Sequence, residues 1–289
     1  MSRGFDHITQ AVRDLDAAGA LYQRVGFTVG TRNLHPQVWG TENRIIQLDG
    51  VFIELLALAD TTHMAPHAPH VFSFGAFNRD FLDRGEGYSM LALEGRGAPD
   101  AEAFRAAGIG DFALDSFERD GRRADGTPIH LAFTLCFAAD PRAPDVSFFT
   151  CQHRHTVSFW DPALQTHANT ATTVAGIVLV AENPADHHVF LSAFTGERNL
   201  VSTSAGVTVK TPRGEIQVMD PSAFTSHFGV MPPDIARGAR FAAVRFAVRD
   251  LAAAVAVVQR SGVAASMRMG RVIVGPAQAM GATLVFEQA

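Results

Sequence analysis

The chain opens with an alternating apolar stretch that is followed by a helical pattern. In FDHITQAV (5–12) apolar and polar residues alternate as on a strand. Asp14 stands where a helix N-cap is expected, and Gly26 stands where the helix would stop. Between them the apolar residues share one helical face: Leu15, Ala18, Leu21, Tyr22 and Val25. Three strand-like runs follow, FTVGTRNL, NRIIQL and VFIELLAL, so the pattern predicts a βαβββ unit.

The same unit recurs near the C-terminus. FAAVRFAVRDLAAAVAVVQRSGV (241–263) repeats the opening stretch at an offset of 236, and eleven of the sixteen positions 11–26 are identical. Weaker copies can be traced from YSMLALEG (88–95) and from VAGIVLVAENPADHHVFLSAFTG (174–196). A single unit cannot bury its own sheet face, so such units come in pairs. We therefore expect an α+β fold of four βαβββ modules, arranged as two paired-module half-barrel domains over residues 1–160 and 170–289.

The first unit carries two polar residues that folding alone does not require. His7 lies in the first strand, and Ala243 replaces it in the C-terminal copy, although that copy keeps Asp250 at the cap position. Glu54 lies within VFIELL, where a carboxylate is costly unless it is paired or bound to a cation. Imidazole and carboxylate together suit Zn²⁺, Fe²⁺, Ni²⁺ or Mn²⁺. The alternative is an ordinary strand histidine, with Glu54 paired to an arginine such as Arg44.

Composition narrows the class of partner. The net charge is −5, the pI is near 6.2, and no block of Lys or Arg gathers anywhere, which argues against nucleic acid and anionic membranes. The N-terminus shows no signal segment and no apolar run is long enough to cross a bilayer, so we expect a cytoplasmic protein. Cys136 and Cys151 lie in apolar runs and are expected to be buried thiols. The expected partner is a small neutral or anionic molecule.

Residues 4–58 resemble a known family. The Asp-His pair in the first strand, the AVRDLDAA helix, the HPQVWGTEN turn and the FIELL strand together resemble the glyoxalase-like branch of the vicinal oxygen chelate superfamily. The resemblance implies glyoxalase-like half-barrels in which a divalent metal chelates two adjacent oxygens of a small substrate. It also implies that the ligands come from the first and last strands of two paired modules. His7 and Glu54 fall on the first module's ligand positions, and Glu54 is the candidate catalytic carboxylate.

The partner module offers a less complete ligand set. Its first-strand position falls near Ser89 or Leu91, and neither is a good ligand. In its last strand, FFTCQHR, we select Gln152 as the third ligand; His153 replaces it if the strand register differs by one. In the second pair of modules, the equivalent positions are Ile177, Ala243 and Val285, with Glu287 two residues beyond, so that pair is expected to be metal-free.

Other residues are candidates for the substrate pocket. His35, Trp39 and Asn43 belong to the HPQVWGTEN turn, which would lie at the rim of the cavity. His153 and His167 lie near the junction between the two halves. Each of these histidines has a surface or turn-stabilising role as its alternative.

Two functions from different classes fit the sequence. The first is a divalent-metal-dependent lyase, isomerase or dioxygenase that acts on a substrate with vicinal oxygens. The second is a metal-free protein that binds or sequesters small aromatic drugs, as bleomycin-resistance members of the superfamily do. In either case the second pair of modules would serve as a scaffold, and we expect a homodimer.

Overall fold

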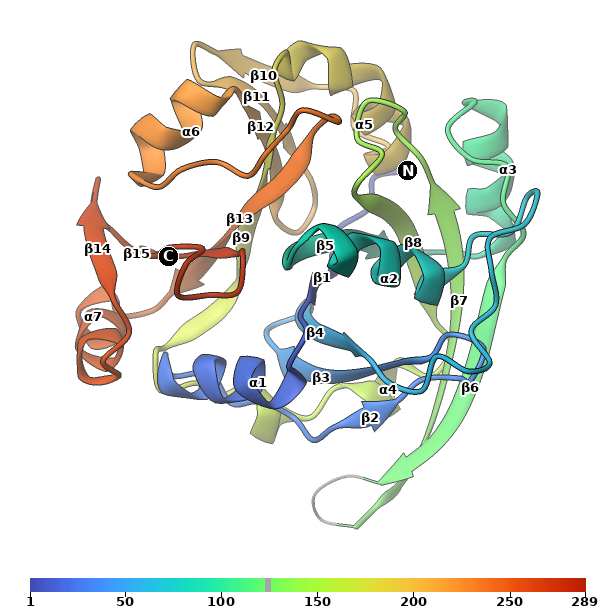
Figure 1. The fold of residues 1–289 in the computed structure, drawn as a ribbon, viewed down its shortest axis with the longest axis horizontal. Helices are drawn as coiled ribbons and strands as arrows, with labels where there is room; N and C mark the ends of the chain where they lie inside the picture. Colours follow the sequence, from blue (N-terminus) through green and yellow to red (C-terminus); the bar gives the residue numbers. More distant parts are fainter. Residues whose placement is uncertain (123–125) are drawn as a thin grey trace.

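The computed structural model describes residues 1–122 and 126–289, which form two curled sheets of eight strands each (Figure 1). The strand orders are β2-β3-β4-β1-β5-β8-β7-β6 and β10-β11-β12-β9-β13-β16-β15-β14. Two of the predicted βαβββ modules build each sheet, and their first strands meet antiparallel at its centre, β1 with β5 and β13 with β9. The predicted fold of two paired half-barrels is confirmed.

The strands of the first sheet are β1 Phe5–Ala11, β2 Asn33–Leu34, β3 Thr41–Gln47, β4 Phe52–Leu58, β5 Gly87–Glu94, β6 Asp115–Arg122, β7 Pro128–Ala138 and β8 Ser147–His153. The strands of the second sheet are β9 Ala171–Val180, β10 Leu200–Thr203, β11 Gly206–Lys210, β12 Glu215–Met219, β13 Arg240–Val248, β14 Ala265–Arg268, β15 Arg271–Val274 and β16 Thr283–Gln288. The α-helices are α1 Leu15–Arg24, α2 Phe74–Arg84, α3 Ala98–Ala106, α4 Thr156–Phe159, α5 His188–Thr195, α6 Pro221–Phe228 and α7 Leu251–Arg260, and the 3-10 helices are η1 Pro162–Gln165 and η2 Pro184–His187. No helix in the described ranges has the length and apolar character needed to span a bilayer.

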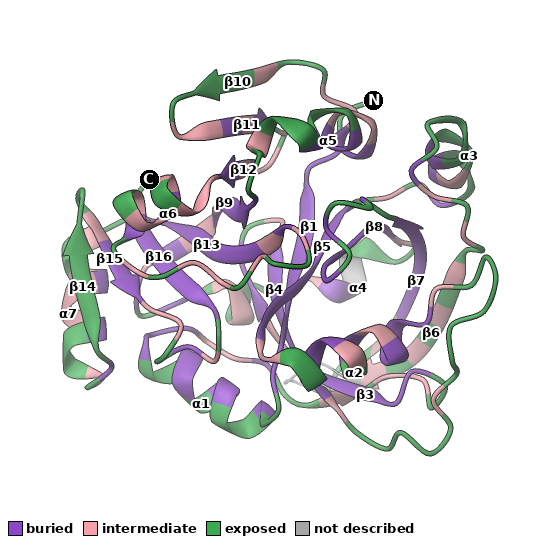
Figure 2. Cartoon of the chain, turned by 45° about the horizontal axis from the view of Figure 1, so that its top comes forward, coloured by how far each residue is buried: buried purple, intermediate pink, exposed green. Residues whose placement is uncertain are grey.

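One continuous core joins the two halves. Buried residues of α1, α3, α5 and α7 belong to it, together with the sheet faces that these helices cover (Figure 2). The ring of Phe27 lies 4.9 Å from that of Phe246, and the ring of Phe148 lies 5.4 Å from that of Phe241, in both cases between the ring centroids. The linker between the halves is packed against this core as well, because the side-chain amide of the buried Asn169 donates a hydrogen bond to the carbonyl oxygen of Val25. The two halves are therefore packed into one body, and the domain limits proposed from the sequence stay a prediction.

Two helices without a counterpart in the βαβββ unit cover the inner faces of the sheets. α2 places Phe74 against the inner face of the first sheet, and α6 places Phe224 and Phe228 against that of the second. Both helices begin at a side-chain cap: Ser73 accepts a hydrogen bond from a backbone N–H of α2, and Asp220 does the same for α6. The inner face of the first half is thus partly covered by a helix that connects its two modules.

The cap predicted at Asp14 gives a first test of the repeated unit. Its carboxylate accepts hydrogen bonds from the backbone N–H groups of Asp16 at 3.0 Å and Ala17 at 2.9 Å, and Asp250 caps α7 in the C-terminal copy. We expect Asp14→Ala to lower the free energy of unfolding by about 1 kcal/mol, measured by urea titration. Asp14→Ser keeps an acceptor oxygen and should lose only a few tenths of that amount; equal losses in the two variants would contradict a capping role.

Candidate active site

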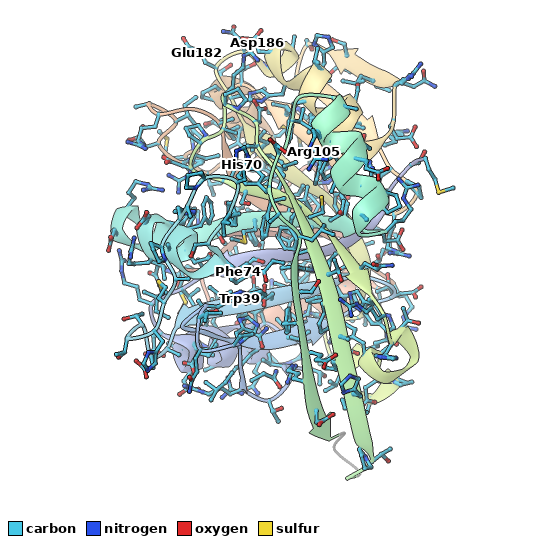
Figure 3. The ribbon with its side chains drawn as sticks, turned by 90° about the vertical axis from the view of Figure 1, so that its right-hand side faces the viewer. Trp39, His70, Phe74, Arg105, Glu182 and Asp186 are labelled. Atoms are coloured by element: carbon cyan, nitrogen blue, oxygen red, sulfur yellow. The ribbon has the colours of Figure 1, made fainter. Side chains whose placement is uncertain are left out.

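The inner face of the first sheet forms a narrow cavity of about 50 Å³ that is partly open to solvent. Its wall is largely aromatic: Trp39, Phe52, Phe74, Phe117, Phe133, Phe149 and Phe159. Trp39 and Phe74, the first residue of α2, stack with their ring centroids 4.5 Å apart, and Figure 3 shows the two close together. The polar lining is short by comparison: His7, His35, Asn43, Glu54 and Arg119. Few convergent polar groups in an apolar cavity are typical of a small-molecule site.

His7 and Glu54 line this cavity side by side, from two neighbouring strands. Thr9 is the β1 partner of Glu54 in β4, and His7 lies two residues earlier on the same face. His7 Nε2 lies 4.0 Å from Glu54 Oε2, which is too far for a hydrogen bond. Glu54 accepts hydrogen bonds from the Thr9 hydroxyl at 2.9 Å and the Asn43 amide at 2.6 Å. Arg44, the alternative partner, instead pairs with Asp16.

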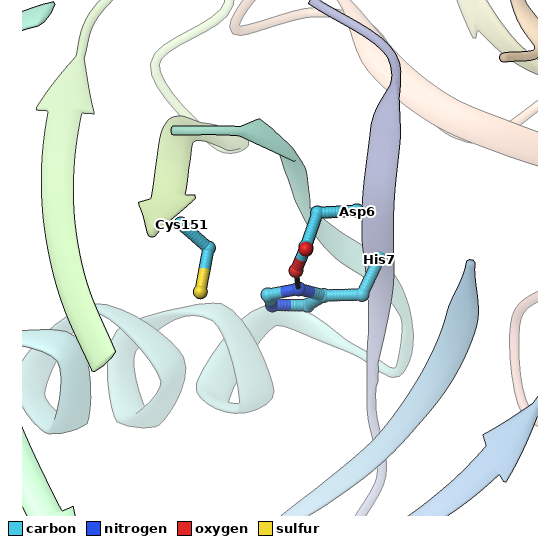
Figure 4. Close-up of side chains that lie close together, drawn as sticks. All are labelled: Asp6, His7 and Cys151. Atoms are coloured by element: carbon cyan, nitrogen blue, oxygen red, sulfur yellow. Dashed lines mark hydrogen bonds and ion pairs between the residues drawn. The ribbon is translucent and has the colours of Figure 1, made fainter. Parts of the chain in front are cut away.

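The carboxylate of Asp6 contacts the His7 imidazole at its Nδ1 atom. Its Oδ1 lies 2.5 Å from His7 Nδ1. This hydrogen bond, the dashed line in Figure 4, holds the proton on Nδ1 and leaves Nε2 facing the cavity. Adjacent strand residues normally point to opposite faces, but the pairing of β1 with β5 is irregular between Phe5 and His7. Cys151 of β8 completes a compact group with Asp6 and His7, whose potential ligand atoms all lie within 4.8 Å of one another.

The Asp6 carboxylate also contacts His153. His153 Nε2 lies 2.9 Å from Asp6 Oδ2, off the line of a good hydrogen bond, so the contact is best described as an ion pair. Burial alone would raise the pKa of Asp6, but the His153 and His7 imidazoles outweigh it and lower that pKa well below its usual range. Burial likewise opposes protonation of His153, yet Asp6 raises the pKa of His153 overall. Asp6 is thus an ionised carboxylate between two imidazoles.

Three predicted pocket residues come together beside Glu54. His35 Nε2 lies 3.4 Å from Glu54 Oε1 and 2.9 Å from the Asn43 amide nitrogen, while His35 Nδ1 lies 2.8 Å from the Thr41 hydroxyl. Burial lowers the pKa of His35 to about 4, against the raising effect of Glu54, so the imidazole is neutral. Trp39 is held by a hydrogen bond from its indole N–H to Asp115 of β6. All three line the cavity.

The other predicted residues lie elsewhere. Gln152 is on the opposite face of β8 from Cys151, with its amide oxygen close to Gly97, so the structure does not bring it to His7 and Glu54. His153 lines a separate cleft with Asp6 and Trp160. His167 is buried: its Nδ1 accepts from the Thr28 backbone N–H and its Nε2 lies 2.8 Å from the Gln47 carbonyl oxygen. It joins the linker to the first module rather than lining the cavity.

Strand register shows which residues of the second module correspond to His7 and Glu54. His7 is opposite Ala92 across β1 and β5. Glu54 lies two residues beyond the β4 partner of His7, which is Phe52, and Cys151 lies two residues beyond the β8 partner of Ala92, which is Phe149. Cys151 therefore occupies the position that corresponds to Glu54. Gln152 is its immediate neighbour in sequence and, for that reason, faces the other way.

In the second half the corresponding space holds an ion-pair network. Arg245 stands at the position of Thr9 and donates hydrogen bonds to Glu287 at 2.6 Å, Gln217 at 2.7 Å and Glu215 at 2.5 Å. Gly176, the β9 partner of Arg245, makes room for Glu215, because a Cβ there would lie 2.7 Å from the Glu215 carbonyl oxygen and 2.9 Å from its Cγ. A protein cation with its own carboxylates thus fills this part of the second inner face.

The donor set in the first half fits a divalent cation. His7 Nε2 has no hydrogen-bond partner in the described part of the chain, and its orientation is fixed by Asp6. Two donors at about 2.1 Å from one cation lie about 3.0–3.5 Å apart at the usual angles, so the 4.0 Å between His7 and Glu54 needs only a small side-chain shift. Imidazole, carboxylate and the nearby thiol of Cys151 are ligands of Zn²⁺ and related metals.

Sequence patterns missed three residues of this region. Asp6 belongs to the Asp-His pair of the first strand, but regular strand alternation predicts it on the face opposite His7. Arg119 lines the cavity from β6, and no local pattern marks it. Cys151 was assigned as a buried thiol, which it is, but it also lines the cavity. If the register of β8 predicted from the sequence had differed by one residue, Cys151 would have been on the cavity face in place of Gln152.

Solved structures share this fold at low sequence identity. A hypothetical protein from Staphylococcus aureus matches with a TM-score of 0.68 and 10% identity, over 99% of this chain and 100% of the other. A triple mutant of 4-hydroxymandelate synthase from Streptomyces coelicolor matches with a TM-score of 0.57 and 9% identity, over 99% of this chain and 92% of the other. No curated protein matches the sequence. The glyoxalase-like domain model matches residues 5–195, more than half of the 289 residues, and the chain therefore belongs to the glyoxalase-like domain family.

Proposed function

We propose that the cavity of the first half is the active site of a divalent-metal-dependent enzyme that acts on a small molecule with two adjacent oxygens. The observation that carries this proposal is the free Nε2 of His7, which faces Glu54 from 4.0 Å inside an aromatic cavity. His7 and Glu54 would hold the metal, with Cys151 as a neighbouring donor in place of Gln152. Zn²⁺, Ni²⁺, Fe²⁺ and Mn²⁺ all suit these donors.

The chain's own residues prepare the site in three ways. Asp6 fixes the tautomer and orientation of His7. Thr9 and Asn43 hold the Glu54 carboxylate, which in this proposal takes or gives a proton at a substrate carbon or oxygen. The neutral His35 beside it can accept or donate a hydrogen bond without adding charge. A bound metal would supply Lewis-acid stabilisation of negative charge on a substrate oxygen, the chemistry shared by lyases, isomerases and dioxygenases of this kind.

One observation favours a second function, a metal-free binding protein. Both oxygens of Glu54 already accept hydrogen bonds, from Thr9 and Asn43, so the buried carboxylate is satisfied without a cation. The aromatic wall would then bind a small drug-like molecule by stacking and apolar contact. The two functions differ in one measurable property, the binding of metal.

Metal content separates them. We expect protein purified without chelator to carry close to one equivalent of a divalent metal by elemental analysis. The double variant His7→Ala, Glu54→Ala should lose it, with affinity reduced by about a hundredfold or more. Metal added to the chelated wild type at about 100 times its Kd should raise stability by about 2.7 kcal/mol, and the double variant should show no such gain.

A matched control is available on the same sheet. His130 and Glu118 form an exposed histidine–carboxylate pair, and His130→Ala, Glu118→Ala should leave the metal content unchanged. The isosteric pair His7→Asn, Glu54→Gln replaces the alanine variants if those do not fold. Wild type that carries no metal and gains no stability from any of the four ions would reject the enzyme proposal and leave the binding protein.

A cytoplasmic location and a homodimer stay predictions from the sequence. Both are open to direct measurement, by cell fractionation and by sedimentation of the purified chain.

A further inference from the structure

Arg119 differs from the other charged residue of the cavity, because no carboxylate of the described residues forms an ion pair with its guanidinium. It is half-buried on β6, and within residues 1–122 and 126–289 it forms no ion pair. Its guanidinium donates a hydrogen bond to Asn33 Oδ1 at 3.0 Å, and a guanidinium has five N–H groups. The other N–H groups of Arg119 have no hydrogen-bond partner in the described residues and are not fully buried, so a ligand anion can reach them.

A polar chain holds this guanidinium in place. Asn33 of β2 accepts from Arg119 and donates through Nδ2 to Asn43 Oδ1 at 3.2 Å, and Asn43 in turn donates to Glu54. Arg119 therefore lies at one end of a fixed row of side chains and Glu54 at the other. Aromatic rings surround the row, and Phe117, two residues from Arg119 on the same strand, packs edge to face against Trp39 at 4.7 Å.

We infer that Arg119 anchors the carboxylate of the substrate, and that the substrate class of this site is a small monocarboxylate with an aromatic or similarly flat apolar body. A planar guanidinium binds a carboxylate through two parallel N–H donors, which fixes the ligand's orientation as well as its charge. One arginine and the nearby negative charge of Glu54 favour a single carboxylate over a phosphate dianion. This inference deepens the proposed function and rests on it only for the metal end of the site.

Binding of benzoate and of its neutral counterpart benzamide tests the inference. The chain has two tryptophans, so Trp160→Phe leaves Trp39 as the fluorescent reporter inside the cavity. In chelator-treated protein we expect benzoate to quench Trp39 and to bind about tenfold more tightly than benzamide. Arg119→Met should weaken the binding of benzoate by about tenfold or more and change the affinity for benzamide by less than about twofold. The benzoate affinity of Arg119→Lys should lie between those of wild type and Arg119→Met.

The controls separate this inference from the metal proposal. Arg79→Gln removes an exposed guanidinium that pairs with Asp80 and should leave both affinities unchanged. Arg119-dependent benzoate binding in protein that holds no metal would support the anchor even if the metal proposal fails. Equal binding of benzoate and benzamide, or benzoate binding that survives Arg119→Met, would overturn it whatever the metal content. Tighter binding of inorganic phosphate than of benzoate would also overturn the choice of a monocarboxylate.

Discussion

Arg245→Met is expected to lower the free energy of unfolding by about 3 kcal/mol, because it leaves Glu215 in the second half-barrel without a cation and Glu287 with Arg271 alone. Glu287 and Glu215 both pair with the Arg245 guanidinium, at 2.6 and 2.5 Å, and their side chains are only 14% and 20% exposed. Methionine fills the space but supplies no donor. Urea unfolding followed by fluorescence measures the loss.

Two further variants show whether the loss comes from the stranded charge. Arg271 also pairs with Glu287, at 2.8 Å, and keeps part of its charge compensated. Glu215 forms no other ion pair in the described residues, so if its stranded charge is the cause, Arg245→Met, Glu215→Gln should be more stable than Arg245→Met alone. Arg79→Gln, at an exposed pair, should cost less than about 1 kcal/mol. A double variant that is less stable than the single one would point to packing instead.

The network around Arg245 explains why one module type gives two different inner faces. Thr9 and Arg245 occupy the same position of the repeat, at an offset of 236. The short Thr9 leaves room and hydrogen bonds Glu54, whereas the long Arg245 crosses the inner face and recruits Glu215 and Glu287. The replacement of His7 by Ala243 is therefore one of several linked differences between the two halves. The first half has a cavity with a free imidazole nitrogen, and the second half has an ion-pair network whose charges compensate one another.

The sequence was informative wherever local periodicity decides structure. The repeat around Asp14 and Asp250 predicted the βαβββ unit, its pairing and the placement of His7 and Glu54 on neighbouring strands. It failed where a single residue of register matters: Gln152 and Cys151 are adjacent, and only the pairing of β8 with β5 and β7 decides which of them faces inward. Arg119 lies far along the chain from Glu54, and no local signal links them.

The helices α2 and α6 were missed for a different reason. Their segments follow the last strand of a module and have no counterpart in the βαβββ unit, so the repeat does not predict them. FSFGAFNRDF has phenylalanines at helical spacing, and Ser73 precedes it as a cap. Phenylalanines at this spacing are typical of a core helix, but only the tertiary fold shows that this helix covers the cavity.

Asp6→Asn in the first half should lower the free energy of unfolding by about 3 kcal/mol near pH 6, as much as Arg245→Met in the second half. The variant keeps the shape of the side chain but removes the charge between His7 and His153. Both imidazoles are buried beside it, with side chains 7% exposed, so the lost interaction is poorly replaced by water. Urea unfolding in the presence of chelator measures this loss without a contribution from bound metal.

The pH dependence of that loss follows from the two pKa shifts. The pKa of Asp6 is lowered on folding, so its contribution is present above about pH 4, the unfolded value, and is lost only as the pH falls through the folded pKa. The pKa of His153 is raised on folding, so its contribution is complete below about pH 6.5 and is lost as the pH rises through the folded pKa. The stability difference between wild type and Asp6→Asn should therefore be largest between about pH 4 and 6.5 and should shrink in alkaline solution.

His153→Gln identifies the group responsible for the alkaline part of this dependence. It removes the imidazole whose pKa is raised and leaves the contact between Asp6 and His7, so its loss of stability should also shrink as the pH rises. In the His153→Gln background, Asp6→Asn should cost less than in wild type, and its cost should no longer fall with pH. A difference between wild type and Asp6→Asn that stays constant from about pH 5 to pH 9 would mean that Asp6 acts through His7 alone, as a support for the candidate ligand rather than as one half of a buried ion pair.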